Sequence, residues 1–207
     1  STSEVYGDHR EEVPLAESAR RIYGPTTQRR WAYADSKAMD EFLALAHHHE
    51  RGLDCVIARL FNTVGPRQSG QYGMVIPRFV RAALAGGPLE VFGDGRQTRC
   101  FCHVEDTVRA LQGLMEETGS GEIFNVGSRN RIAILDLAGR VLELTGADAE
   151  IVHVPFESVY EHGIEDMLHR IPSTDKIRGA IGWEPQRTLD EILADVIAHE
   201  RAEIAAS

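Results

Sequence analysis

Apolar residues along the chain follow two alternating patterns, which predict strands and helices in turn. Short runs rich in β-branched and aromatic residues predict strands at 54–61, 89–92, 98–104, 122–126 and 150–154. Longer segments with apolar residues at helical spacing predict helices at 31–51, 74–85, 105–117, 133–145 and 188–204. Residues 1–7 are predicted to end a strand, and 8–30 and 156–175 to form polar connections. This alternation favours an α/β fold with parallel strand pairing.

The predicted helix at 31–51 carries the clearest apolar stripe. Met39, Phe42, Leu43 and Ala46 recur at helical spacing, and Gly52 follows as a stop signal. We therefore expect an amphipathic helix here.

Composition narrows the class of protein. The 207 residues include 22 basic and 32 acidic side chains, which gives a net charge of −10, and 43% are hydrophobic. That balance is typical of a globular protein, and the acidic charge argues against a nucleic-acid partner. No apolar run approaches the roughly 20 residues that a membrane span needs. We therefore expect neither nucleic acid nor membrane as a partner.

Cysteine and histidine usage argues against disulfides and metal sites. Cys55, Cys100 and Cys102 form an odd set without a CxxC motif, so we expect reduced thiols in a cytoplasmic protein. The three histidines at 47–49 point about 100° apart from one another on a helix and cannot converge on one ion.

The strongest local motif is the segment from Tyr33 to Lys37, which has the form YxxxK. Residues at this spacing share one helix face, with Cβ atoms roughly 5–6 Å apart. An ammonium group beside a phenol lowers the phenol pKa and makes it a usable proton acceptor. A solvent-exposed helix pair explains the same two residues, so the motif alone leaves both interpretations open.

Weaker signals lie at predicted strand ends. Thr2, Ser3 and Glu4 stand where open α/β sheets bind ligands, although a polar turn accounts for them too. Asn62 and Arg67 lie in a Gly-Pro turn after the strand at 54–61, and both can contact a polar ligand or solvent.

Two arginines have the chemistry of a phosphate clamp. Arg99 lies between apolar strand positions, and Arg170 lies in the segment His169-Arg170-Ile171-Pro172. The planar guanidinium suits bidentate binding of phosphate, but a buried salt bridge explains each arginine equally well.

Seven motifs in order resemble the nucleotide-sugar epimerase/dehydratase/decarboxylase branch of the extended short-chain dehydrogenase/reductase family. They span nearly the whole chain, and their joint order is far more specific than any one of them. The motifs are STSEVYG (1–7), YADSK (33–37), RLFNTVGPR (59–67), PLEVFGDGRQTRCFCHVEDTVRAL (88–111), FNVGS (124–128), HRIPSTDK (169–176) and IGWEP (181–185).

The resemblance implies NAD as cofactor and a UDP-sugar as substrate. It implies that Tyr33 is the acid/base, that Lys37 lowers its pKa and holds the nicotinamide ribose, and that Thr2 binds the sugar 4-hydroxyl. NAD would be bound by Tyr33, Lys37 and Leu60, and the substrate by Asn62, Arg67, Arg99 and Arg170. Catalysis would involve Tyr33, Lys37, Thr2, Ser3, Glu4 and Arg170.

Three reactions of the family share a first oxidation at sugar C4. Ser3 replaces the aspartate expected of a 4,6-dehydratase, whereas Thr2-Ser3-Glu4 together with Arg170-Ile171-Pro172 match the decarboxylase pattern. The resemblance therefore favours UDP-glucuronate decarboxylase-like chemistry, with a UDP-glucose 4-epimerase-type reaction as the alternative.

The resemblance also implies a particular domain organisation. We expect the C-terminal part of a Rossmann-like parallel sheet at 1–66, and at 67–207 a small α/β substrate-binding domain with some segments returning to the sheet. None of the 19 glycines forms the GxGxxG turn that binds NAD. We therefore expect a chain that begins within a longer protein, whose full-length form is a homodimer. The competing hypothesis is a non-catalytic fragment that cannot bind NAD alone.

Overall fold

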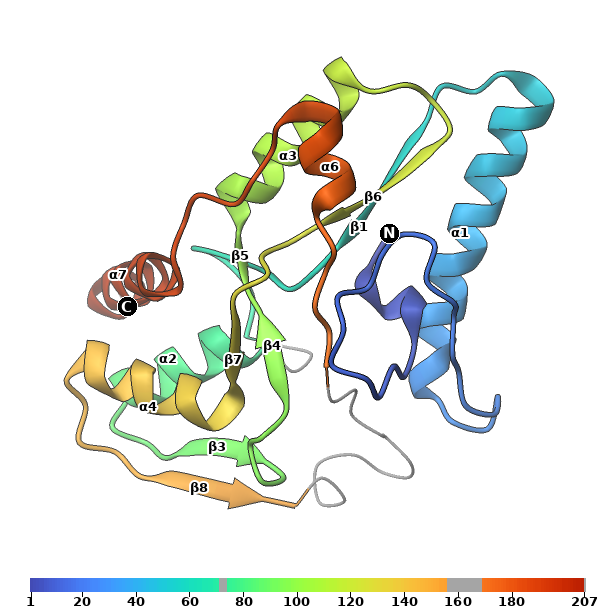
Figure 1. The fold of residues 1–207 in the computed structure, drawn as a ribbon. Coiled ribbons are helices and arrows are strands. Elements are labelled where there is room, and N and C mark those ends of the chain that lie inside the picture. The colour runs from blue at the N-terminus through green and yellow to red at the C-terminus, as the bar shows by residue number, and fades with distance from the viewer. Residues whose placement is uncertain (71–73, 156–168, 207) are drawn as a thin grey trace.

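The computed structural model describes residues 1–70, 74–155 and 169–206 (Figure 1). The elements follow in the order η1 (Ser3–Tyr6), α1 (Arg30–Arg51), β1 (Val56–Leu60), β2 (Thr63–Val64), α2 (Val75–Leu84), β3 (Leu89–Phe92), β4 (Thr98–Cys100), β5 (Cys102–His103), α3 (Val104–Glu117), β6 (Glu122–Val126), β7 (Arg131–Ala133), α4 (Ile134–Thr145), β8 (Ile151–Val154), α6 (Asp175–Ile181) and α7 (Leu189–Ala206).

The described strands associate in four pairs. β1 pairs with β6, β2 with β5 and β3 with β8, all in parallel, whereas β4 and β7 are antiparallel. The α/β class predicted from sequence is confirmed, and parallel pairing holds for three of these four pairs. The prediction missed β7, because three residues are too few to display a period.

All five predicted helices are present, with ends shifted by no more than two residues. The predicted strand at 98–104 is interrupted at Phe101 and forms β4 and β5 instead. The sequence did not predict the short helix α6. Of the predicted polar connection at 156–175, residues 156–168 lie outside the described part of the chain.

The prediction for residues 1–7 needs a correction. Thr2 makes an isolated parallel bridge with Leu60, but Ser3–Tyr6 then turn into the 3-10 helix η1. This turn depends on Gly7, whose φ is 75° and where a Cβ atom would lie 1.9 Å from the Ile22 carbonyl oxygen. Only glycine fits this position, so the last residue of the motif STSEVYG lets the chain end η1 and pass close to Ile22.

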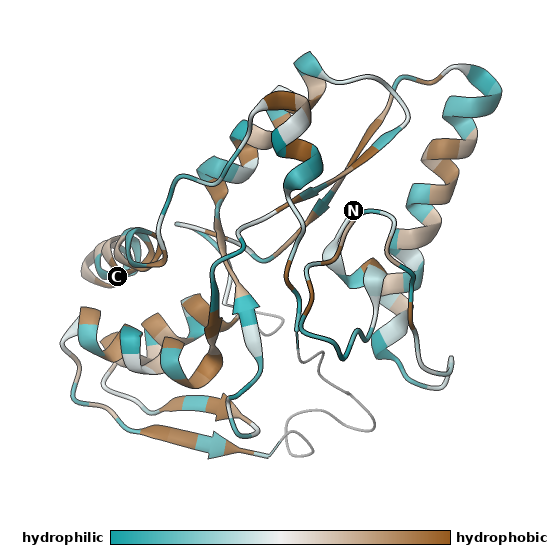
Figure 2. Cartoon of the chain, in the orientation of Figure 1, coloured by the Kyte–Doolittle hydropathy of each residue, from teal (hydrophilic) through white to brown (hydrophobic). Residues whose placement is uncertain are grey.

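Two regions lie side by side in the molecule (Figure 1). In the first, β1 and β6 lie between α1 on one side and α3 and α6 on the other. In the second, α2, α4 and α7 pack with β3 around a cluster of buried apolar residues. Figure 2 shows apolar residues along β3 and β8 and on the helices beside them. The predicted boundary between 66 and 67 stays a prediction, although α3, β6 and α6 do return to the first region.

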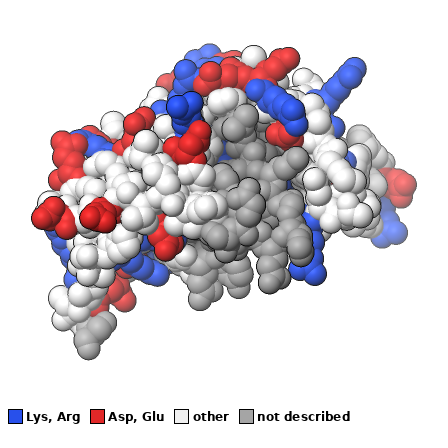
Figure 3. Space-filling view, turned by 90° about the horizontal axis from the view of Figure 1, so that it is seen from below, with Lys and Arg blue, Asp and Glu red and all other residues white. Residues whose placement is uncertain are grey.

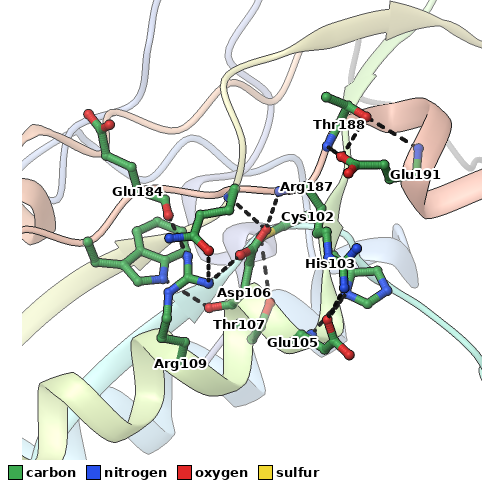
Figure 4. Close-up of polar contacts among 12 residues, drawn as sticks. Cys102, His103, Glu105, Asp106, Thr107, Arg109, Glu184, Arg187, Thr188 and Glu191 are labelled. Carbon is green, nitrogen blue, oxygen red and sulfur yellow. Dashed lines mark hydrogen bonds and ion pairs between the residues drawn. The ribbon is translucent and has the colours of Figure 1, made fainter.

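A buried carboxylate connects the two regions (Figure 4). Asp106, near the start of α3, accepts hydrogen bonds through Oδ2 from the backbone N–H groups of Gln186 and Arg187, both at 3.0 Å. Its Oδ1 pairs with Arg109 at 2.7 Å, and its backbone oxygen accepts from Trp183 Nε1 at 3.0 Å. These contacts fix the segment that leads into α7, so this helix closes the apolar cluster of the second region.

The apolar stripe of α1 is not its buried face. Met39, Phe42 and Leu43 are 53–59% exposed, whereas the buried residues of α1 are Trp31, Ala34, Ala38 and Glu41. The apolar stripe predicted the helix correctly. A different face of α1 packs against η1 and against the end of β1 at Phe61, because its small alanine side chains allow a close approach.

Candidate active site

A cleft of about 860 Å³ lies where η1, β1 and β2 meet α2 and β4. It brings together eight of the ten predicted site residues and leaves Lys37 and Arg67 outside its lining. The eight are Thr2, Ser3, Glu4, Tyr33, Leu60, Asn62, Arg99 and Arg170. They come from five separate stretches of the chain, so the fold itself makes this site.

Residues Thr2 to Glu4 are held against the end of β1. The Leu60 backbone N–H donates to the Ser1 oxygen at 3.3 Å, which continues the sheet for one more step. Thr2 Oγ1 accepts from the Glu4 backbone N–H at 3.3 Å and thereby caps η1. Ser3 is buried beside them. The hydroxyl and carboxylate groups of this segment therefore line the cleft from a fixed turn.

Glu4 is held between two arginines. Arg170 Nη1 donates to Glu4 Oε1, and Arg30 Nη2 donates to Glu4 Oε2 at 3.4 Å. All three side chains keep one-fifth or less of their surface exposed. Arg170 Nε is also buried and has no hydrogen-bond partner among the described residues. Arg170 thus retains a buried donor beside its ion pair.

The sequence analysis missed Arg30. The signal available for it is its spacing, because Arg30 precedes Tyr33 by one helical turn and therefore lies on the same side of α1.

Tyr33 and Lys37 have different surroundings. The Tyr33 side chain lines the cleft and is 54% exposed. Lys37 Nζ donates to Asp40 Oδ2 at 2.9 Å, and this hydrogen bond raises the pKa of Lys37, with a smaller contribution from Tyr33. Lys37 is therefore a cation one turn from the phenol, and its action on Tyr33 stays a prediction.

Asn62 and Arg99 form part of the cleft wall, and both donate hydrogen bonds to backbone oxygens of β4. Asn62 Nδ2 donates to the Cys100 oxygen at 2.9 Å. Arg99 is buried, and its Nη1 donates to the Thr98 oxygen at 2.8 Å. Arg67 instead has a left-handed backbone with φ of 68° and an exposed side chain. Its predicted role in substrate binding has no support from this geometry and stays a prediction.

The opposite wall contains Arg78 and Gln97, which the sequence analysis did not assign to a site, together with Phe92 of the motif that begins with PLEVFG. The Arg78 guanidinium of α2 lies 4.2 Å from the centroid of the Phe92 ring, and both residues line the cleft. Gln97 is buried and donates through Nε2 to the Phe92 oxygen at 3.0 Å. A flat ring under a guanidinium offers a stacking surface beside a positive charge.

The charge of the cleft opposes the charge of the whole chain. Four arginines line it among the described residues, namely Arg30, Arg78, Arg99 and Arg170, against the single carboxylate of Glu4. The chain as a whole has a net charge of −10. On the face in Figure 3, acidic and basic side chains are mixed over the described surface. A cationic cleft in an acidic protein favours a ligand with several negative charges.

The described residues fit one end of NAD. Tyr33 and Thr2 present hydroxyl groups in the cleft, Leu60 adds an apolar contact at the sheet end, and Lys37 is held as a cation nearby. These groups suit the nicotinamide ribose, whereas the sequence contains no GxGxxG turn for the diphosphate of the dinucleotide.

The described part of the chain shows neither a metal centre nor a membrane-spanning helix. No group of three or more His, Cys, Asp and Glu side chains is placed to hold a metal ion there. Likewise, none of the helices over 1–70, 74–155 and 169–206 combines the length and apolarity needed to cross a bilayer.

Two curated relatives match almost the whole chain. The UDP-N-acetyl-alpha-D-glucosaminuronate decarboxylase of Bacillus cytotoxicus is 43% identical over 198 residues, which are 95% of this chain and 61% of the relative. UDP-glucuronic acid decarboxylase 6 of Arabidopsis thaliana is 38% identical over 194 residues, which are 92% of this chain and 53% of the relative. The chain thus spans between half and two thirds of the length of these relatives.

Solved structures share the architecture. The UDP-glucose 4-epimerase of Thermotoga maritima, solved with UDP-glucose, has a TM-score of 0.85 and 29% identity, covering 99% of this chain and 62% of that one. The dTDP-glucose 4,6-dehydratase of Streptomyces venezuelae, solved with NAD, has a TM-score of 0.84 and 29% identity, covering 99% and 59%. The fold is therefore that of Rossmann-like extended short-chain dehydrogenases/reductases.

One family model covers more than half of the chain. It matches residues 1–127, which include the η1 segment, Tyr33, Asn62 and Arg99, and it describes an NAD-dependent family. Together with the cleft and the relatives, this match confirms the resemblance seen in the seven sequence motifs. The chain belongs to the NAD dependent epimerase/dehydratase family.

Proposed function

We propose that the complete protein containing this chain decarboxylates a UDP-linked uronic acid, through a 4-keto intermediate of the sugar. The observation that carries the proposal is the state of Arg170 in the cleft. Its Nη1 binds Glu4, while its Nε is buried and without an acceptor among the described residues. A sugar carboxylate supplies such an acceptor, because a guanidinium binds a carboxylate through two parallel N–H groups.

The charge balance and the relatives support the same substrate class. A UDP-uronate carries a diphosphate and a carboxylate, which suits a cleft with four arginines and one glutamate. Both relatives described above are named as decarboxylases of UDP-sugar acids.

Each side chain then has a defined task. Thr2 orients the sugar 4-hydroxyl, and Tyr33 removes its proton as the C4 carbon is oxidised. Arg170 binds the C5 carboxylate, and Glu4 and Arg30 hold Arg170 in place. Asn62 and Arg99 bind the diphosphate.

Ser3 offers no carboxylic acid for the elimination that a 4,6-dehydratase performs. Once C4 is a ketone, the carboxylate on C5 lies β to it, so the bond from C5 to the carboxylate breaks, CO₂ leaves and the electron pair forms an enolate with the C4 carbonyl. Protonation at C5 and return of the hydride to C4 would then complete the reaction.

NAD is the cofactor of the family. When bound, it supplies the hydride acceptor for sugar C4. We assign Tyr33, Lys37 and Leu60 to its nicotinamide end.

A 4-epimerase is the second candidate. The structural similarity to the Thermotoga maritima UDP-glucose 4-epimerase favours it, and Arg170 would then bind phosphate. A third possibility is a non-catalytic fragment, because the sequence has no GxGxxG turn for NAD.

The product of one incubation separates these functions. The complete protein and the 207-residue chain are each incubated with NAD and with UDP-glucuronate, UDP-N-acetylglucosaminuronate, UDP-glucose or UDP-GlcNAc, and products are identified by mass. Loss of CO₂ from a uronate supports the decarboxylase, and a new stereoisomer of unchanged mass supports the epimerase. If natively purified protein neither binds NAD nor turns over any of these sugars, the non-catalytic alternative stands.

We also propose that the complete protein forms a homodimer through α1. The apolar side chains of Met39, Phe42 and Leu43 are more than half exposed on one face of this helix. Sedimentation of the complete protein and of Phe42→Asp tests the proposal, since a dimer that becomes a monomer only in the variant supports it. The cytoplasmic location stays a prediction.

A further inference from the structure

We propose that Asn125, in the motif FNVGS, is a positioning residue that sets the geometry of the Glu4–Arg170 ion pair. This inference rests on the proposed function, and it gives a role to a motif that the assignment of the active site leaves unused. Asn125 lies in β6, opposite Arg59 of β1, and is completely buried.

The side chain of Asn125 forms hydrogen bonds through both of its polar atoms. Its Oδ1 accepts from the Tyr6 hydroxyl at 2.6 Å. Its Nδ2 donates to two backbone oxygens, that of Leu15 at 2.8 Å and that of Ser173 at 3.2 Å. One side chain therefore holds three segments of the chain that are all distant from Asn125 in the sequence.

Asparagine suits this position for a chemical reason. The two backbone oxygens can only accept hydrogen bonds, so a nitrogen with two hydrogens must face them. An aspartate at this position would place an acceptor against these two oxygens. A leucine would remove all three hydrogen bonds, so the Tyr6 hydroxyl and the two backbone oxygens would be buried without the partner that Asn125 provides.

Two of the three segments carry the partners of the ion pair. Tyr6 ends η1, two residues after Glu4. Ser173 follows Arg170 by three residues, and Leu15 pairs with the intervening stretch, because Leu15 N donates to Ile171 O at 2.8 Å. The Glu4–Arg170 contact thus spans the same two segments that Asn125 holds together.

A second layer of contacts fixes the loop on which Leu15 lies. The backbone N–H of Asn125 donates to Glu17 Oε1 at 2.8 Å, and Arg59 Nη1 donates to the Glu17 oxygen at 2.9 Å. The Arg59 guanidinium also lies 4.8 Å from the centroid of the Tyr6 ring. Tyr6 and the 15–17 loop are therefore held on both sides of Asn125.

The consequence for catalysis follows from distance. Arg170 must meet the sugar carboxylate while Glu4 and Thr2 keep their places, and a shift of about 1 Å in a catalytic group can reduce the rate by as much as 100-fold. Loss of the Asn125 contacts moves the two segments relative to each other without touching the nucleotide contacts of Asn62 and Arg99.

The test uses Tyr6→Phe and Asn125→Leu in the complete protein, with Thr145→Val as a matched control. Thr145 donates a hydroxyl hydrogen bond to the Val141 oxygen at 2.7 Å in α4, and it does not line the cleft. For Tyr6→Phe we expect kcat on a UDP-uronate to fall about tenfold, while KM and the Kd for UDP change less than about twofold. The control keeps its wild-type kcat. An unchanged kcat in Tyr6→Phe, or an equal loss in the control, overturns the inference.

A second readout does not depend on turnover. Hydrogen exchange of the 207-residue chain reports on the backbone N–H groups of Leu15, Ser173 and Ile22, which donate to Ile171, Leu15 and Tyr6. We expect faster exchange at all three in Tyr6→Phe and Asn125→Leu, but not in Thr145→Val.

The exchange experiment also separates the two proposals. If wild type turns over no uronate but exchange rises on both segments, the proposed function fails while the positioning role of Asn125 stands. If exchange rises on one segment only, Asn125 does not couple them and the inference fails. Should Asn125→Leu not fold, Tyr6→Phe decides alone.

Discussion

The two regions of this molecule are stabilised in different ways. The region of α2, α4 and α7 encloses a cluster of sixteen buried residues, all of them apolar. The region that contains β1 and β6 instead has two smaller buried apolar clusters, one of five residues on the side of η1 and α1 and one of seven on the side of α3 and α6. Beside the five-residue cluster it buries the Arg59–Glu41 ion pair, whose side chains are each 8% exposed, and the Tyr6–Asn125 hydrogen bond.

The difference shows how a fold separates stability from precision. Apolar packing is strong and non-directional, so it stabilises the second region without fixing any one polar group. Hydrogen bonds and ion pairs add little net stability, but they impose direction and distance. The η1 segment and Arg170, to which we assign catalytic roles, lie in the region that uses directional contacts.

The largest expected effect is that of Tyr33→Phe, which should reduce activity without reducing stability. Tyr33→Phe removes the oxygen to which we assign the removal of the sugar proton, so we expect kcat of the complete protein to fall by about 1,000-fold or more. Tyr33 is exposed, and the midpoint of urea unfolding should therefore stay within error. Kinetics with a UDP-uronate measures the fall in kcat, urea denaturation measures the unfolding midpoint, and calorimetry measures whether UDP binding is kept. Retained turnover would remove Tyr33 from its role.

In the region of α2, α4 and α7 we expect a substitution to lower stability and leave ligand binding unchanged. Phe79 is completely buried in α2, and Phe79→Ala leaves a cavity that lowers the free energy of unfolding by about 4 kcal/mol. Urea denaturation of the 207-residue chain measures this. Below the unfolding transition, variant protein should bind UDP with affinity near that of wild type. A loss under about 1 kcal/mol would contradict the packing described for this region.

The buried Arg59–Glu41 ion pair provides a further test of the difference between the two regions. Glu41→Leu leaves the Arg59 guanidinium buried without its carboxylate, so we expect a loss of about 3 kcal/mol. The double variant Arg59→Met/Glu41→Leu should recover most of that stability while kcat stays reduced, because Arg59 also holds the 15–17 loop. If the double variant is as active as wild type, the ion pair is not needed for precision.

The smallest expected effect concerns the thiols. Burial raises the pKa of Cys100 and of Cys102 to about 11, whereas Cys55 is partly exposed. Iodoacetamide at pH 8.5 should therefore modify Cys55 in the native chain well before the other two. Peptide mass spectrometry gives the order, and equal rates at all three thiols would show that the region around β4 and β5 opens readily.

The same thiols give a pH dependence with a definite sign. In the unfolded chain the thiols of Cys100 and Cys102 ionise at about pH 8.5, whereas the folded chain keeps these thiols protonated until about pH 11. The folded state thus binds more protons in this interval, and the free energy of unfolding falls as pH rises through it. The Cys100→Ala/Cys102→Ala variant should show a smaller fall.

Much of the fold could be predicted because its signals are local. Caps and stop signals identified the helices, as with Gly52 after α1 and the acidic Glu105 and Asp106 at the start of α3. Elements of three or four residues, such as β7 and η1, contain too few positions for a period to appear. The helix α6 has only seven residues and a glycine within it, so its pattern was equally weak.

The site was predictable where a motif marks it and hidden where the fold assembles it. Thr2, Tyr33 and Arg170 belong to recognisable motifs, and the structure brings all three to one cleft. Arg30 has no motif of its own. Its spacing from Tyr33 places it on the same side of α1, but its contact with Glu4 spans 26 positions and is seen only in the fold. The buried face of α1 was hidden for the same reason, since the sequence cannot say which neighbour packs where.

One measurement tests the central claim that Arg170 selects a carboxylate-bearing sugar. The Kd values of UDP-glucuronate and UDP-glucose are compared by calorimetry in the wild-type complete protein and in Arg170→Gln. We predict that the variant loses about tenfold or more in affinity for UDP-glucuronate, while its affinity for UDP-glucose changes by less than about twofold. Equal losses for the two ligands, or no loss for the uronate, would contradict the account.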